Sequence, residues 1–380
     1  MIKRAAIAMS SVSSSARAQR TFLEYQYLFV FLAPLVFVVG VILAAPLPTA
    51  AGEGYWLEFW WLFPVFLLGA TIVNTVGISG SALFVPFLIF LYPVLAVRLS
   101  PTTLTEPPLS PETIVKVGLI SESFGLSSSA LAFIQHGLVD RRLAVALVGG
   151  AIPFVVGGAL LSFVIPEPIF QLLLGIALLT ASVMLFKADL GHEEPGEADA
   201  GTAGVEADGG KTLPDDDAKP GDAGVSTDAD GVVTRVDRGG SDYSYDRGGY
   251  LERFANYSIG GVFQGLAGFG IGELGIISML RTSVPVRIAI GTNHIVVAMT
   301  AVLASLVHVF GGGVVGGHAI DLASTPWNMV VWTVPATVTG GQIAPYISST
   351  LDTEILKQGV GVLFAVIATA LFVMASGGLL

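Results

Sequence analysis

Apolar segments long enough to cross a membrane recur throughout this chain and limit its fold more than any other feature. They lie at residues 27–45, 60–97, 112–136, 143–164, 169–186, 254–280, 286–310, 327–348 and 355–374. A helix needs roughly 20 mainly apolar residues to cross the hydrocarbon core of a bilayer. The chain is 53% hydrophobic and 12% charged, and its mean hydropathy is +0.75. We therefore predict an all-α polytopic membrane protein embedded in the lipid bilayer.

The net charge of −11 is concentrated in one segment. Residues 188–250 hold 16 of the 29 acidic residues and five of the 18 basic residues. Asp, Gly and Ala dominate there and large apolar residues are scarce, so we predict an acidic disordered linker without a fold or a site. Its acidity suits the salt-rich cytoplasm of a halophile, and the alternative is a tail that binds metal or a partner. Since the chain has no cysteine, disulfides and cysteine-ligated metal sites are excluded.

Two of the apolar segments are interrupted by glycine. The run 60–97 is too long for one spanning helix and contains Gly77 and Gly80, whereas 254–280 contains Gly268, Gly270 and Gly272. Backbone N–H and C=O groups freed inside a membrane must be satisfied by protein or by a water-filled cavity. An interrupted helix at membrane depth therefore indicates a site.

The order of these features indicates an internal duplication. Residues 76–81 parallel 269–274, and the pair at 157–158 parallels the pair at 340–341. We predict a basic segment with an extra N-terminal helix at 1–58, a first repeat at 59–187, the linker at 188–253 and a second repeat at 254–380. Each repeat has about four helical elements, of which the first is broken by glycine.

The broken elements are either re-entrant hairpins or single spans. With hairpins, each repeat contains three full spans and the repeats are inverted, and Arg141, Arg142, Arg281 and Arg287 lie in the cytoplasm. The positive-inside rule favours that arrangement. We therefore predict hairpins, a cytoplasmic N-terminus and alternating access by movement of one repeat against the other.

The helix breaks offer a mechanism for binding a small anion. A helix N-terminus presents unpaired N–H groups and about half a positive charge, so it binds anions without Lys or Arg. The alternative is that the glycines only permit close helix packing. The predicted substrate-binding residues are Asn74, Gly77, Ser79, Gly80, Ser81, Ser123, Ser128, Gly270, Gly272, Thr292, Asn293 and His294. For His294 the alternative is a hydrogen-bonded packing residue.

Two acidic residues lie within apolar segments. A charge at the bilayer centre costs about 2.5–3.5 kcal/mol on insertion scales, so Glu122 and Glu273 are candidates for proton coupling. Their alternative role is to accept hydrogen bonds from backbone that the breaks leave free.

Sequence signatures of common enzymes are absent. The chain has no Gly-x-Ser-x-Gly elbow, phosphate-binding P-loop or paired-histidine zinc motif, and the glycines at 268–272 follow no strand. We predict no catalytic residue, metal, cofactor or nucleic-acid partner. The alternatives are a membrane-embedded enzyme that uses Glu122, Glu273 and His294, or a non-transporting membrane subunit.

Several of these motifs resemble the sulfite exporter TauE/SafE family, also called the toluene sulfonate uptake permeases. They are residues 77–86, the helix 119–129 leading to 137–140, and the pair 268–272 and 289–292. The resemblance covers about 59–375 without the linker. It implies a secondary transporter that moves sulfite, a sulfonate or a related organosulfur anion across the plasma membrane. A proton or a sodium ion is a candidate coupling ion. Ser79 and Ser81 depart from a more glycine-rich family pattern, and Glu273 adds an acid.

Overall fold

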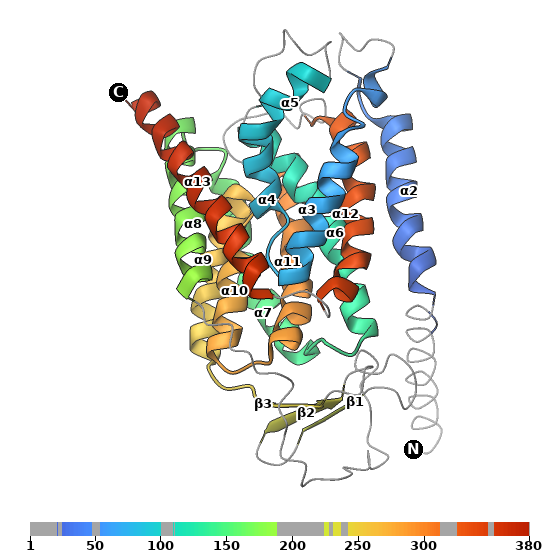
Figure 1. The fold of residues 1–380 in the computed structure, drawn as a ribbon, viewed down its shortest axis with the longest axis vertical. Helices are drawn as coiled ribbons and strands as arrows, with labels where there is room; N and C mark the ends of the chain where they lie inside the picture. The colour runs from blue at the N-terminus through green and yellow to red at the C-terminus, as the bar shows by residue number, and fades with distance from the viewer. Residues whose placement is uncertain are drawn as a thin grey trace, which may run out of the picture.

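The computed structural model describes residues 21, 25–47, 54–99, 109, 111–187, 224–227, 231–236, 242–311, 325–348 and 353–379. Before the sheet lie α2 (Gln26–Ala44), η1 (Tyr55–Leu57), α3 (Leu62–Val76), α4 (Ser81–Pro86), the π-helical η2 (Phe87–Leu91), α5 (Tyr92–Leu99), α6 (Pro111–Gln135), α7 (Arg141–Leu161) and α8 (Glu167–Lys187). After β1 (Gly224–Thr227), β2 (Val232–Val236) and β3 (Asp242–Asp246) come α9 (Tyr250–Ala267), α10 (Ile271–Arg281), α11 (Val286–Phe310), α12 (Trp327–Ser348) and α13 (Thr353–Leu379). The prediction of an all-α polytopic membrane protein is confirmed (Figure 1).

The outside of the bundle is apolar, and its apolar core also holds buried polar side chains. Large apolar side chains are exposed on α2, α7, α8 and α13, among them Leu35, Val145, Val183 and Val366. Within the described residues, four helices are long and apolar enough to cross a membrane: Tyr55–Val76, Thr113–Gln135, Arg141–Leu161 and Val286–Phe310. Because hydrocarbon solvates apolar side chains, this surface fits a bilayer and the polar side chains gather inside.

The first glycine-broken segment folds back on itself. α3 ends where Gly77 has a φ of +78°, a conformation that glycine adopts without steric strain. Beyond the bend, Phe84 of α4 stacks on Phe66 of α3, and their ring centroids are 4.2 Å apart. Tyr92, which begins α5, stacks on Trp61, which precedes α3, at 6.0 Å. The end of the segment therefore lies beside its beginning.

The second glycine-broken segment also folds back. α9 ends at Gly268, and a second bend residue, Gly270, has a φ of +120°. Arg253, at the start of α9, donates a 2.5 Å hydrogen bond to the hydroxyl of Thr282, which follows α10. The two hairpins open at opposite ends of the bundle: α5 lies at the upper end in Figure 1, and α9 begins at the lower end, beside the sheet. Both glycine-broken segments are therefore hairpins in the structure, and not the single spans that the sequence allowed as an alternative.

Helices from the two sequence halves interleave. α12 packs chiefly on α3 and α6, α7 packs on α9, and α8 pairs with α13. α11 lies between them, against α6 and α7, near the middle of the bundle (Figure 1). Neither half therefore forms a core alone.

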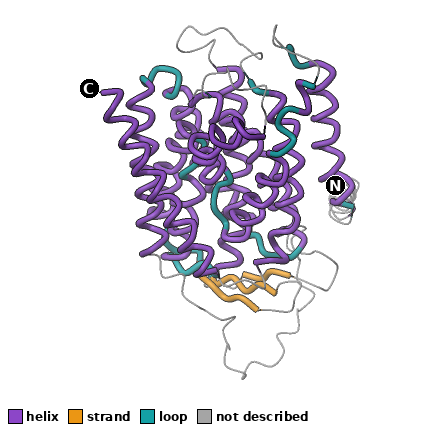
Figure 2. Tube along the Cα trace, turned by 45° about the horizontal axis from the view of Figure 1, so that its top comes forward, coloured by secondary structure: helices purple, strands orange, loops and turns teal. Residues whose placement is uncertain are grey.

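A three-stranded antiparallel sheet lies at one end of the bundle (Figure 2), within the segment predicted to be a linker without a fold. β2 pairs with both β1 and β3, and the pairs Val233–Tyr245 and Arg235–Tyr243 place four buried side chains on one face. This alternation is the period-two pattern of a half-buried strand. The structure differs from the prediction here because acidic composition obscured a short alternating pattern. α9 also begins four residues before the predicted boundary at 254.

The sheet is anchored to the connection between α6 and α7. Arg247 donates from Nε to Asp140 Oδ2 over 2.7 Å, and Tyr245 Oη donates to the same oxygen over 3.0 Å. Arg235 donates to the carbonyl of Gly137 from Nε and Nη2, at 3.0 and 2.7 Å. Burial alone raises the pKa of Asp140, but the hydrogen bonds and positive charge of Arg247 outweigh it and hold that pKa below its ordinary value.

Candidate functional site

The two glycine bends meet inside the bundle. A Cβ atom built on Gly272 would lie 2.8 Å from both the backbone nitrogen and the hydroxyl of Ser79. A Cβ on Gly268 would lie 3.4 Å from the Cβ of Ser81. Glycine is therefore required at Gly272 for the backbone of one bend to approach the other this closely.

Glu273 joins the two bends. Its Oε1 accepts a 3.0 Å hydrogen bond from the backbone N–H of Ser79, and its Oε2 accepts one of 2.8 Å from the N–H of Gly270. The first contact spans 194 residues of sequence. Both carboxylate oxygens thus hold N–H groups that the bends free from helical bonding.

Glu122 of α6 binds the first bend at Ser81, two residues beyond the contact of Glu273. Its Oε2 accepts the N–H of Ser81 at 3.1 Å and also the hydroxyl of Ser81. Its Oε1 is buried and has no hydrogen-bond partner among the described residues. We predicted that the helix N-termini at the breaks bind a small anion. In the structure, two carboxylates of the protein itself accept their hydrogen bonds.

Asn293 of α11 fixes the carbonyl side of both bends. Its amide Nδ2 donates to the carbonyls of Gly77 and Gly272, at 3.0 and 2.8 Å. Its Oδ1 accepts a 2.6 Å bond from the hydroxyl of Tyr257 on α9. One side chain therefore ties the two bends together.

The structure brings together most of the predicted site residues. Gly77, Ser79, Gly80, Ser81, Gly270, Gly272, Asn293, Glu122 and Glu273 all lie at or beside the paired bends.

The other predicted residues make their hydrogen bonds elsewhere. Asn74 donates to Ala70 within α3, Ser123 bonds to Leu119 and Ser305, and Thr292 accepts from the N–H of Asp140. His294 contacts the hydroxyl of Ser129 through Nδ1 at 3.1 Å, and its ring lies 5.0 Å from that of Phe133.

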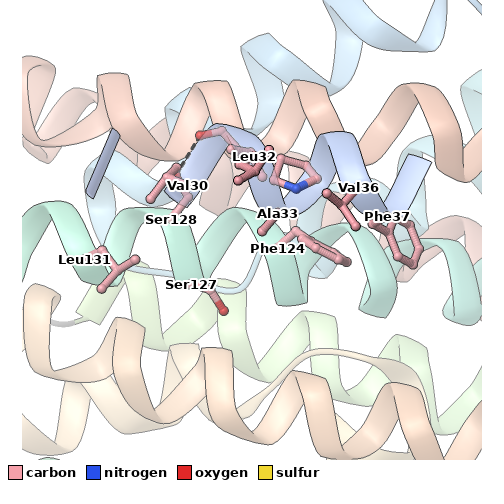
Figure 3. Close-up of a pocket in the computed structure, with 11 residues that line it drawn as sticks. Val30, Leu32, Ala33, Val36, Phe37, Phe124, Ser127, Ser128 and Leu131 are labelled. Carbon is pink, nitrogen blue, oxygen red and sulfur yellow. Dashed lines mark hydrogen bonds between the residues drawn. The ribbon is translucent and has the colours of Figure 1, made fainter. Parts of the chain in front are cut away.

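Ser128 lines a separate groove between α2 and α6 (Figure 3). The groove has a volume of about 590 Å³, and most of its lining is apolar, including Val30 and Leu32 of α2 and Phe124 of α6. The Ser128 hydroxyl donates to the carbonyl of Val338 on α12 at 2.8 Å. Its hydrogen bonds therefore connect α6 with α12 and leave the bends to other residues.

Two residues at the bends were not predicted. Gln264 Oε1 accepts a 3.4 Å hydrogen bond from the Ser79 hydroxyl, and Tyr257 holds Asn293 as described. Both are fully or almost fully buried. The sequence signal that could have indicated them is a side chain with a polar group on an apolar helix that ends at a glycine bend.

Comparison with known families decides the class of protein. Residues 62–371 match the family model described as sulfite exporter TauE/SafE. The chain belongs to the sulfite exporter TauE/SafE family. Membership implies a membrane transporter of sulfur-containing anions, in agreement with the apolar exterior and the buried polar side chains of the bundle. The TauE/SafE match begins with α3 and ends within α13, so α2 lies outside it. Searches of curated proteins and of solved structures returned no match.

Proposed function

We propose that this TauE/SafE protein is a secondary transporter of a small sulfur oxyanion, such as sulfite or a sulfonate, which binds where the two bends meet. The observation that carries the proposal is the pair of carboxylates, Glu122 and Glu273, on the free N–H groups of the bends. A carboxylate is itself a small oxyanion. Donors that hold it inside a membrane suit the oxygens of another oxyanion.

We assign the proton-coupling role to Glu122. Both oxygens of Glu273 are used in joining the bends, whereas one oxygen of Glu122 has no partner among the described residues. An ionised Glu122 competes with an anion for the donors of Ser81, and Glu273 is the other carboxylate that faces it. Protonation of Glu122 removes its charge and frees these donors. Anion and proton are then bound together.

The test is flux of radiolabelled sulfite in proteoliposomes under an imposed pH gradient. Wild type should accumulate or release label according to the gradient. Glu122→Gln, which cannot ionise, should abolish the response to the gradient. A full response in this variant would reject Glu122 as the proton carrier.

A matched pair of glycine variants tests the place of binding. Gly80→Leu inserts a side chain at a position whose Cβ would lie 3.0 Å from the ring of Phe84 and 3.7 Å from the Cβ of Glu122. Gly149→Leu adds the same side chain where nothing lies within 4 Å. We expect flux to be lost in the first and kept in the second. Equal flux in the two variants would refute this site.

A further inference from the structure

The bends present negative groups as well as N–H donors. Gly77 ends α3, so its carbonyl lies at a helix C-terminus, which carries about half a negative charge. The N–H of Ser79, in the same bend, is one of the donors assigned to the anion. A carbonyl oxygen left uncovered this close to an oxyanion would repel it. Anion binding at the bends is therefore strongest when another group covers their carbonyls.

Asn293 covers these carbonyls in one orientation of its amide only. Its Nδ2 donates to Gly77 and Gly272, across 216 and 21 residues of sequence. The NH₂ group of an amide only donates and the oxygen only accepts, so the reversed amide would turn its oxygen towards two carbonyl oxygens. In the observed orientation Oδ1 faces Tyr257, and the 2.6 Å bond from the Tyr257 hydroxyl pairs this buried oxygen.

Tyr257 owes its position to a glycine on the neighbouring helix. Its side chain is buried on α9, and α10 passes directly over its ring. A Cβ atom on Gly275 of α10 would lie 2.5 Å from the ring Cζ and 2.7 Å from the hydroxyl oxygen. A larger residue at 275 would therefore push the phenol away from Asn293.

We propose that Tyr257 is a positioning residue for anion binding, which holds Asn293 in the orientation that covers the carbonyls of both bends. Gly275 leaves the space that the phenol needs. The inference rests on the proposed function, because it takes the paired bends as the anion site. Without the Tyr257 hydroxyl, Oδ1 of Asn293 is buried and unpaired, so the amide turns towards another donor and uncovers the carbonyls.

The test measures the KM and the maximal rate of radiolabelled sulfite flux in proteoliposomes. Tyr257→Phe removes only the hydroxyl, and it should raise KM about 10-fold with little change in maximal rate per folded protein. Gly275→Ala should also raise KM, because it displaces the phenol. A residue that only stabilised the fold would lower the amount of active protein and leave KM unchanged.

Thr333→Val is the matched control. The Thr333 hydroxyl on α12 accepts a 2.7 Å bond from the hydroxyl of Ser121 on α6, and both residues are buried. This variant therefore loses a buried bond between helices, as Tyr257→Phe does. Both should lose thermal stability, but only Tyr257→Phe should raise KM. In an Asn293→Ala background, Tyr257→Phe should raise KM no further, since the residue through which it acts has lost its amide.

The outcomes separate the inference from the proposed function. If wild type transports sulfite and Tyr257→Phe keeps the wild-type KM, the inference is overturned and the proposed function stands. A further rise of KM in the Asn293→Ala background would also overturn it, because Tyr257 would then act by another route. If wild type transports neither sulfite nor methanesulfonate, the proposed function fails and the inference fails with it.

Discussion

Glu122 and Glu273 should respond differently to the same substitution, although both are buried carboxylates at the bends. Glu273 uses separate oxygens for Ser79 N–H and Gly270 N–H. In Glu273→Gln the amide oxygen can accept only one of these, and the NH₂ group faces the other donor. Loss of one charge-assisted hydrogen bond in a buried site costs about 2–4 kcal/mol of unfolding free energy.

Glu122 accepts both Ser81 donors on a single oxygen, Oε2. An amide oxygen can occupy that place, and the new NH₂ group would lie where Oε1 has no partner among the described residues. Glu122→Gln should therefore keep the bonds from Ser81 but bury an NH₂ group without an acceptor, at a cost of about 1–2 kcal/mol, which is less than that of Glu273→Gln.

Thermal unfolding of the two purified variants in the same detergent, followed by tryptophan fluorescence at pH 7, measures the difference. Glu273→Gln should unfold at a clearly lower temperature than wild type, and Glu122→Gln at a temperature between the two. If Glu122→Gln is the less stable variant, the division into a residue that joins the bends and a residue that binds the proton is wrong.

Two further perturbations address the close approach of the bends and the anchored sheet. Gly272→Ala should lower stability by about 1–3 kcal/mol through contact with the backbone at Ser79, whereas Gly149→Ala should not; chemical or thermal unfolding checks both. Since the pKa of Asp140 is lowered by Arg247, its stabilising contribution is complete above the unfolded value of about 3.9 and is lost as pH falls through the lower folded value. The protection factors for hydrogen exchange in β3 should therefore fall below about pH 4 in wild type, and in Arg247→Gln they should be lower already at pH 7. Equal β3 exchange in the two proteins at pH 7 would contradict this anchoring role.

The sequence predicted the helices and the bends well because both depend on local properties. α11 and α12 have the bounds expected from the apolar segments, and the bends lie at glycines whose φ is positive. An interrupted helix in a membrane needs partners for its backbone groups, which is why the bends could be predicted to mark a site.

The partners themselves were not predictable, because they depend on distances between remote residues. Which N–H group Glu273 holds is decided by a contact across 194 residues. Thr292 and His294 lie one residue on either side of Asn293, yet they bond to Asp140 and Ser129. Sequence proximity therefore placed two residues in the site whose side chains point to other elements.

The interleaving of the helices determines which parts of the protein can move as rigid bodies. A Cβ on Gly265 of α9 would collide with the backbone of Val155 and Ala159 on α7, so these two helices touch without side chains between them. α12 has the same relation to α3, where a Cβ on Gly340 would lie 2.9 Å from the carbonyl oxygen of Leu67. The expected motion of one sequence half against the other would separate both contacts. A motion that preserves them pairs α7 with α9 in one body and α3 with α12 in another, and the boundary then passes between α3 and α9, through the two bends that Glu273 and Asn293 hold together.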